Sequence, residues 1–227
     1  MITAASNSRI KRLVQLNQKS KLRRTEDVFL AEGVKMFLEA PREQLQEVYV
    51  SESFLEKCSC REHMEEVGYE VVSDSVFSKI SDTCTPQGVL CVLKQFHYNI
   101  EEMLRDKAPL FLLLENIQDP GNLGTMLRTG EGAGVSGIIM SRDTVDLYNP
   151  KVIRSTMGSI YRVPFYYADD FAAAVHQVQQ AGVSVYAAHL RGKNSYACQD
   201  YTKGTAFLIG NEGNGLREET AELADCY

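Results

Sequence analysis

Apolar residues in the first part of the chain alternate between helix-like and strand-like spacing. Residues 8–20 form a rough apolar stripe and predict a helix. Shorter apolar runs, several rich in β-branched residues, predict strands, and the helical stretches between them end at Pro41 and Gly68. The predicted strands are 28–33, 48–51, 69–73 and 88–96, and the predicted helices between them are 34–40 and 53–68. We therefore predict a small α/β domain over residues 1–96.

A second series of apolar runs begins after residues 97–108, which lack strand character and are predicted to be a linker. Its first run, PLFLLLEN, is continuously apolar, which is typical of a strand covered on both faces of a parallel sheet. The predicted strands are 109–116, 136–141, 163–168, 183–190 and 205–210, and the predicted helices are 122–133, 150–158, 170–181 and 215–224. Residues 109–227 are thus predicted to form an α/β domain with a mostly parallel sheet and right-handed crossovers.

Two loops after predicted strands combine glycines with polar side chains, at the strand ends where open α/β sheets bind ligands. The first is NIQDPGNLGTMLRTGEGAGV and the second lies in FLIGNEGNGL. The second has the spacing GxxGxG, and the chain has no GK[ST], so neither a dinucleotide fingerprint nor a P-loop is present. A nucleotide-dependent oxidoreductase is therefore disfavoured. The glycine density favours a ligand that lies against bare backbone.

The charge is unevenly distributed along the chain. The net charge is −6, yet no acidic residue precedes Glu26, while seven basic residues do. This asymmetry indicates either a nucleic-acid contact or a solvated helix face. The candidate RNA-binding residues are Arg9, Lys11, Arg12, Arg23 and Arg24.

Composition narrows the class of protein further. Hydrophobic and charged contents of 44% and 24% are those of an ordinary soluble protein. No run approaches the roughly 18 apolar residues that a membrane span needs, and the N-terminus has no apolar signal region, so we expect a cytoplasmic protein. The six cysteines and four histidines lack paired metal-ligand spacing, which predicts reduced thiols and no metal site.

Three stretches carry a family resemblance. DPGNLGTMLRTGEGAGV (119–135) resembles the first motif of the SpoU, or TrmH-like, ribose 2′-O-methyltransferases of the SPOUT class, and LIGNEGNGL (208–216) resembles their second motif. The stretch that runs from ASNSRIKRLVQL to RRTEDVFLAEGVKMFLEA is similar to the N-terminal substrate-binding domain of the rRNA-modifying branch. The resemblance implies a knotted C-terminal domain, S-adenosylmethionine as cofactor, ribosomal RNA as substrate and a homodimer formed through the C-terminal domain.

The resemblance also implies roles for individual residues. Arg128 matches the arginine assigned to the reacting ribose, and Asn122 and Glu212 match polar residues that position it. The residues that match the cofactor pocket are Gly210, Asn211, Gly213 and Gly215. Deprotonating an arginine at neutral pH costs roughly 7 kcal/mol, because guanidinium keeps its proton above about pH 12. Arg128 therefore acts either as a base or, at lower cost, as a charge that stabilises the developing alkoxide or a phosphate. Glu131 fits a structural partner of Arg128 or of a neighbouring group.

The sequence departs from the family in one respect. The third family motif, with Ile-Pro-Met and Ser-Leu-Asn stretches, follows the second, whereas this sequence stops at AELADCY. We expect the catalytic domain to be truncated here before that motif. The alternatives are an RNA-binding protein of the same fold without catalysis, or a methyltransferase that acts on transfer RNA.

Overall fold

The computed structural model describes residues 1–58, 60–193 and 195–227. The chain divides into two compact units, and each is described by itself. Unit 1 comprises Met1–Phe96 with Asp146–Tyr161, and unit 2 comprises His97–Val145 with Arg162–Tyr227. Residues 146–161, which the sequence analysis places in the second domain, therefore pack with the N-terminal residues.

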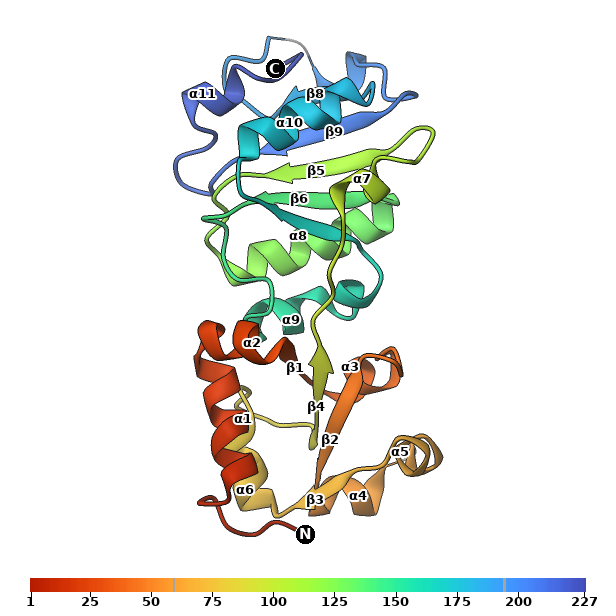
Figure 1. Ribbon diagram of the computed structural model, residues 1–227, viewed down its shortest axis with the longest axis vertical. Coiled ribbons are helices and arrows are strands. Elements are labelled where there is room, and N and C mark those ends of the chain that lie inside the picture. The colour runs from red at the N-terminus through yellow and green to blue at the C-terminus, as the bar shows by residue number, and fades with distance from the viewer. Residues whose placement is uncertain (59, 194) are drawn as a thin grey trace. The chain divides into compact units, whose positions relative to one another are not determined.

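Unit 1 contains a four-stranded mixed sheet in the order β1-β4-β2-β3 (Figure 1). The strands are β1 (Val28–Glu32), β2 (Leu45–Ser51), β3 (Glu70–Val72) and β4 (Val89–Lys94). β4 pairs antiparallel with both β1 and β2, and β3 pairs parallel with β2. The helices are α1 (Ser8–Gln18), α2 (Ser20–Glu26), α3 (Val34–Leu38), α4 (Glu52–Lys57), α5 (Arg61–Val67) and α6 (Asp74–Ile80). Apolar residues of α1 and α6 form one buried cluster with β1, β2, β3 and β4, which explains the apolar stripe of the first helix.

Two predicted helices of unit 1 differ from the structure. The first ends at Gln18, and α2 follows separately, because Lys19 adopts an extended conformation (φ −117°, ψ 104°) between them. The helix predicted over 53–68 is two helices, α4 and α5; Ser59, inside that range, lies outside the described residues. The short helix α6 has no counterpart among the predicted elements.

Buried contacts fix residues 146–161 to the rest of unit 1. This segment contains α9 (Pro150–Thr156) and the 3₁₀ turn η1 (Ser159–Tyr161). Arg23 is only 3% exposed, and its guanidinium donates hydrogen bonds to Asp146 (2.6 Å) and to the carbonyl of Leu16 (2.6 Å). The Tyr161 hydroxyl donates to the carbonyl of Met36 (3.0 Å). Arg23, on α2, thus links α1 and residues 146–161 through the hydrogen bonds of its buried side chain.

Unit 2 contains a five-stranded parallel sheet in the order β7-β6-β5-β9-β8. The strands are β5 (Leu110–Leu114), β6 (Gly137–Ser141), β7 (Phe165–Ala168), β8 (Ser184–Ala187) and β9 (Thr205–Ile209). From β5 the chain moves outward to β6 and β7, and it then returns to place β8 and β9 on the other side of β5. The order in which strands are added therefore reverses between β5 and β9. Ligands of such sheets bind at this switch point.

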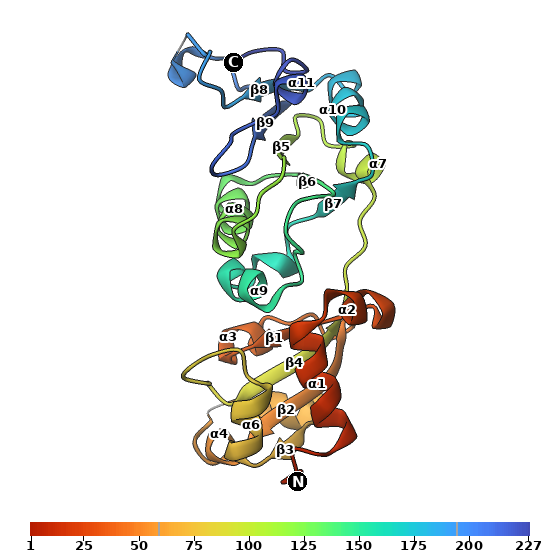
Figure 2. The same cartoon turned by 90° about the vertical axis from the view of Figure 1, so that its left-hand side faces the viewer.

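Helices pack on both faces of this sheet: α8 (Pro120–Ala133) lies on one face and α10 (Phe171–Gln180) on the other (Figure 2). The reversal of strand order requires this arrangement when the crossovers are right-handed. Buried residues of α10 share a core with Phe111, Leu113 and Leu208. On the other face, Leu112 lies toward α8 and is only half-buried, as are Phe207 and Ile209 on β9. The apolar run of β5 is thus fully covered on one face only.

The segment predicted as a linker contributes to the core of unit 2. Residues 100–103 form the short helix α7 (Ile100–Met103), whose two terminal side chains are buried among the residues packed against α10. The last helix, α11 (Glu218–Ala221), is shorter than the predicted 215–224, because residues 211–215 form a loop. Among the described residues, no helix combines the length and apolar character needed to cross a membrane, and no group of three or more potential ligands could hold a metal ion.

Candidate active site

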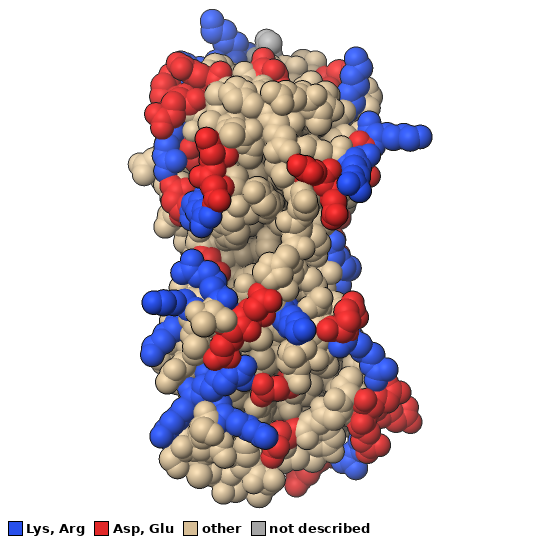
Figure 3. Space-filling model, in the orientation of Figure 1, with Lys and Arg blue, Asp and Glu red and all other residues tan. Residues whose placement is uncertain are grey.

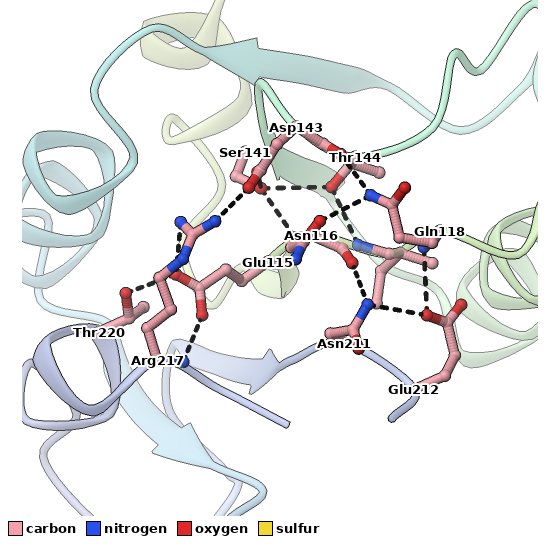
Figure 4. Close-up of polar contacts among 11 residues, drawn as sticks. Glu115, Asn116, Gln118, Ser141, Asp143, Thr144, Asn211, Glu212, Arg217 and Thr220 are labelled. Atoms are coloured by element: carbon pink, nitrogen blue, oxygen red, sulfur yellow. Dashed lines mark hydrogen bonds and ion pairs between the residues drawn. The ribbon is translucent and has the colours of Figure 1, made fainter. Parts of the chain in front are cut away.

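The two stretches predicted to bind a ligand begin at the carboxyl ends of neighbouring strands (Figure 4). The glycines of the first stretch lie in α8 and at its C-cap, Gly134, so the loop before the helix contains none. The first loop, residues 115–119, leads from β5 into α8, and the second loop, residues 210–217, leads from β9 into α11. Because β5 and β9 pair in parallel, with Leu114 opposite Ile209, both loops begin at the same edge of the sheet. They therefore meet at the switch point.

The second loop closes on itself. The N–H of Asn211 donates to the carbonyl of Gly215 (3.0 Å), and the N–H of Gly215 donates back (2.9 Å). The side-chain oxygen of Asn211 accepts the N–H groups of Gly213 and Asn214, both at 3.0 Å, and its amide donates to the carbonyl of Asn116 (2.8 Å). Asn211, predicted to line the cofactor pocket, uses its side chain to shape the loop.

The three glycines of the second loop have different structural reasons. A Cβ at Gly210 would lie 2.2 Å from backbone atoms of Gly215 and Leu216, so closure of the loop requires glycine there. Gly215 has φ +70°, a conformation that side chains disfavour. A Cβ at Gly213 would meet only a side-chain oxygen at 3.6 Å, which is ordinary contact. Packing therefore explains two of the three glycines and leaves Gly213 unexplained.

Glu212 joins the second loop to the first. Its carboxylate accepts the backbone N–H groups of Gln118 (3.1 Å) and Asp119 (3.0 Å) and the side-chain amide of Asn122 (3.2 Å). Partial burial raises the pKa of Glu212, but the hydrogen bonds from Asp119, Gln118 and Asn122 outweigh it, so the pKa lies below its ordinary value. The structure thus brings together Asn122 and Glu212, two of the three predicted catalytic residues.

Hydrogen bonds also tie the first loop to β6. Asn116 adopts the left-handed conformation (φ 54°), and its N–H donates to the Ser141 hydroxyl (2.8 Å). The side-chain amide of Gln118 donates to Asn116 Oδ1 and to the carbonyl of Asp143, both at 2.6 Å. The first loop is therefore hydrogen-bonded to the ends of both strands that flank β5.

A buried carboxylate follows β5. Glu115 is 1% exposed, and it accepts the Thr220 hydroxyl (2.6 Å) and the backbone N–H of Arg217 (2.8 Å). The Arg217 guanidinium contacts Glu115 at 3.4 Å and pairs with Asp143. Burial raises the pKa of Asp143, but hydrogen bonds from Ser141 and Arg217 outweigh it and lower the pKa overall. The hydrogen bond to Asp143 in turn raises the pKa of Arg217.

Glu115, Asp143, Arg217 and Thr220 were not among the residues predicted from the sequence. The available signal was a carboxylate that directly follows the continuous apolar run of β5, where an acid is buried only with hydrogen-bond partners.

Arg128, the third predicted catalytic residue, lies apart from Asn122 and Glu212. It is exposed on α8, six residues and about 9 Å of helix rise beyond Asn122. Within the described part of the chain it has no hydrogen-bond or ion-pair partner. Glu131, a predicted partner of Arg128 or of a neighbouring group, instead forms an ion pair with Arg162, whose Nη2 donates to Glu131 Oε2 at 3.3 Å.

The predicted RNA-binding residues of unit 1 fall into two groups. Arg23 is buried and Arg12 pairs with Glu26 (2.6 Å) and Glu47 (2.8 Å). The prediction for Arg23 is wrong, because its side chain is buried and both terminal nitrogens donate to groups inside the fold. Arg9, although exposed, pairs with Glu70 (3.2 Å). Lys11 and Arg24 are exposed and have no ion-pair partner among the described residues.

Two further lysines belong with Lys11 and Arg24. Lys19 and Lys21 are exposed, and no ion pair involves them in the described ranges. We call Lys11, Lys19, Lys21 and Arg24 the basic patch. Figure 3 shows basic side chains gathered over α1 and α2. The charge run alone did not separate these residues from the arginines that the fold uses.

Comparison with known proteins identifies the family. Residues 109–227 match the family model of the SpoU rRNA Methylase family, and residues 7–91 match that of the MRM3-like substrate binding domain. The chain belongs to the SpoU rRNA methylase family. Both motif resemblances noted in the sequence lie inside the matched range, and the predicted family and fold class are confirmed.

Individual SpoU relatives are similar over most of the chain. The 23S rRNA (guanosine(2553)-2′-O)-methyltransferase RlmP of Bacillus subtilis is 31% identical over 227 residues, which cover 99% of this chain and 87% of that protein. The AdoMet-bound rRNA methyltransferase from Sinorhizobium meliloti superposes with a TM-score of 0.84 at 30% identity, over 99% of this chain and 86% of that one. The methyltransferase AviRb from Streptomyces viridochromogenes, at 22% identity over 97% and 87% of the two chains, shares the fold with a TM-score of 0.86.

The junction between the two SpoU loops predicts a pH-dependent contribution to stability. Because the folded pKa of Glu212 is depressed, its stabilisation is present above the unfolded pKa of about 4.3 and is lost as pH falls through the folded pKa. We expect Glu212→Gln to destabilise the protein at pH 7, by less than about 1 kcal/mol because the side chain is exposed. Urea unfolding should show the difference begin to shrink as pH falls below the unfolded pKa of about 4.3, and disappear once pH is below the folded pKa.

Glu219→Gln is the matched control for this measurement, since Glu219 is exposed on α11 and has no hydrogen bond in the described part of the structure. A wild-type advantage over Glu212→Gln that persisted unchanged at pH 3.5 would contradict the assignment to an ionised carboxylate.

Proposed function

We propose that this chain transfers a methyl group from S-adenosylmethionine to a ribose 2′-hydroxyl of ribosomal RNA. The observation that carries the proposal is the junction of the two family motifs at the switch point of a parallel sheet, closed by Glu212. Relatives over most of the chain are named as rRNA ribose methyltransferases, and one is solved with AdoMet bound. Family membership, cofactor and reaction class are thus mutually consistent.

The second loop fits the cofactor. Gly213 and Gly215 are exposed, and a Cβ at either position would meet no backbone atom within 4 Å, so the loop offers bare backbone on its outer side. Packing gives no reason for glycine at position 213, whereas a ligand against the backbone does. We propose that Gly210, Asn211, Gly213 and Gly215 form one wall of the site. The cofactor supplies a methyl group on a positively charged sulfur.

The protein's own groups have distinct tasks in this proposal. Asn122 and Glu212 hold the start of α8 against the second loop and so orient the site before substrate arrives. Arg128 presents an exposed, unpartnered guanidinium among the described residues, which can meet a phosphate or the alkoxide that develops on the ribose. This role uses arginine in its charged form and avoids the cost of deprotonation.

We expect Arg128→Ala to lower methyl transfer at least about a hundredfold, because a charge near the developing alkoxide is lost. RNA affinity should stay within about threefold of the unmodified protein, since the basic patch is unchanged. Arg105→Ala is the matched control, because Arg105 is an exposed arginine of unit 2 whose guanidinium likewise has no hydrogen-bond or ion-pair partner among the described residues. Retained turnover of tritiated S-adenosylmethionine in Arg128→Ala would refute the catalytic assignment.

We propose that the basic patch on α1 and α2 contacts RNA phosphates. Three of its four exposed cations lie on the consecutive helices α1 and α2, and the fourth, Lys19, lies between them; none has an ion-pair partner in the described ranges. The one acidic residue of these helices, Glu26, is paired with Arg12. Phosphate contacts release counterions, so the logarithm of the association constant should fall linearly with the logarithm of the salt concentration.

Arg24 and Arg23 are adjacent in sequence and should give opposite results. Arg24→Gln should reduce the slope of log K against log salt by roughly 0.7 to 0.9, while changing stability by less than about 0.5 kcal/mol. Arg23→Gln should cost about 2 kcal/mol of stability, because the buried charge-assisted hydrogen bonds are lost, and should leave the slope unchanged. Fluorescence anisotropy over a salt series and urea unfolding separate the two. Equal salt slopes for Arg24→Gln and Arg23→Gln would contradict a phosphate contact by Arg24.

We also propose a homodimer formed through unit 2. The face of the sheet toward α8 leaves Leu112, Phe207 and Ile209 half-exposed, and parallel sheets bury both faces. Sedimentation velocity at micromolar concentration should therefore give about twice the chain mass of 25.4 kDa. A mass of a single chain at that concentration would contradict the dimer.

Residence in the cytoplasm remains a prediction, supported by the ribosomal substrates of the bacterial relatives.

A further inference from the structure

The second loop is anchored at both ends by different groups. Its entry is fixed by β9 and by the hydrogen bonds between Asn211 and Gly215. Its exit is fixed at Leu216, which is 8% exposed in the core, and at Arg217, where α11 begins. Arg217 is the N-cap residue of α11, but its own side chain makes no cap hydrogen bond, so the cap must come from elsewhere in the fold.

Glu115 supplies that cap from the end of β5. One carboxylate oxygen accepts the N–H of Arg217 (2.8 Å) and the other accepts the hydroxyl of Thr220 (2.6 Å). Arg217 is the last residue of the loop and Thr220 lies in α11, which follows it, and Glu115 is only 1% exposed. A buried carboxylate is costly unless it is hydrogen-bonded, so removing either partner destabilises the contact between Glu115 and this segment.

We propose that Glu115 is a positioning residue that holds the second loop in its cofactor-binding conformation before the cofactor arrives. The proposal rests on the proposed function for the identity of the cofactor, although the anchoring itself does not. Residues Glu212–Gly215 are exposed, so the position of the loop depends on its internal hydrogen bonds, on Glu212 and on its anchored exit rather than on burial in the core. Pre-organisation by Glu115 removes an ordering cost that binding otherwise meets.

The expected signature is a loss of affinity that saturating cofactor overcomes. If only a fraction of molecules holds the loop correctly, the apparent dissociation constant rises by the inverse of that fraction. Once the cofactor is bound, the loop is correct again, and turnover recovers. A residue that stabilised the transition state directly would instead lower turnover at any cofactor concentration.

Thr220→Val is the most conservative variant, because it removes one hydroxyl and keeps the shape. Its matched control is Thr205→Val, at the opposite end of β9, where a buried threonine hydroxyl donates to the carbonyl of Lys203 (2.9 Å). Each variant loses one hydroxyl hydrogen bond, which is buried at Thr220 and part-buried at Thr205, so Thr205→Val controls for the loss of a threonine hydroxyl beside the same sheet. Of the two threonines, Thr220 alone donates to Glu115. Glu115→Gln tests the carboxylate itself.

Hydrogen exchange of the full chain without cofactor is the first measurement. The amides of Gly213, Asn214 and Gly215, all hydrogen-bonded inside the loop, should exchange at least about tenfold faster in Thr220→Val and Glu115→Gln than in the unmodified protein and Thr205→Val. Equal exchange in all four proteins would overturn the proposal. So would equal acceleration in Thr205→Val, since that outcome means general loosening of the sheet.

Calorimetry with S-adenosylhomocysteine and steady-state kinetics complete the test. The dissociation constant should rise at least about tenfold in Thr220→Val and Glu115→Gln, while kcat at saturating S-adenosylmethionine stays within about threefold. An unchanged dissociation constant, or a kcat that stays low at saturation, would overturn the positioning role. If the unmodified protein binds no S-adenosylhomocysteine, the proposed function fails, whereas the exchange measurement still decides whether Glu115 holds the loop.

Discussion

The parallel pairing of β5 with β9 is the constraint on which the site depends. These strands are far apart in the sequence, yet Leu114 lies opposite Ile209, and the N–H of Glu115 donates to the Ile209 carbonyl at 2.9 Å. This pairing places the residues that follow each strand side by side. Because the order of the strands reverses between β5 and β9, their carboxyl ends lie at the switch point where open α/β sheets bind ligands. Glu212 then closes the junction by accepting donors that the turn into α8 leaves free.

Much of this arrangement was predictable because periodicity and strand order are local or topological properties. The parallel sheet and the two loops at its carboxyl edge follow from alternating apolar runs and from where glycines interrupt them. Whether Asn122 meets Glu212 needed the pairing partner of β9, which no spacing rule supplies; family resemblance named both residues without showing their contact. The position of residues 146–161 in unit 1 was not predictable either, because the buried bond between Arg23 and Asp146 joins positions 123 residues apart.

Charge patterning predicted a nucleic-acid surface near the start of the chain without separating the exposed basic residues from those that the fold uses. Seven basic residues precede Glu26, and an unpaired run of this kind indicates a nucleic-acid surface. The fold divides that run by helix face: Arg23 lies on the buried side, Arg12 and Arg9 meet carboxylates, and the basic patch remains for solvent or ligand. Helical periodicity could have suggested this division for Arg23, seven residues after the buried Leu16. The break at Lys19, which separates α1 from α2, hid that relation.

The glycines of the second loop show how one composition signal can have several causes. Gly210 allows the loop to close, because its missing Cβ admits the backbone of Gly215 and Leu216, and Gly215 provides a positive φ. These two would be needed in an empty loop of the same shape. Only Gly213 lacks an internal reason, so it is the position whose missing side chain points most directly to a ligand. The loop is thus shaped first by its own backbone and by Glu115 and Glu212, and a ligand-binding surface is what remains once those requirements are met.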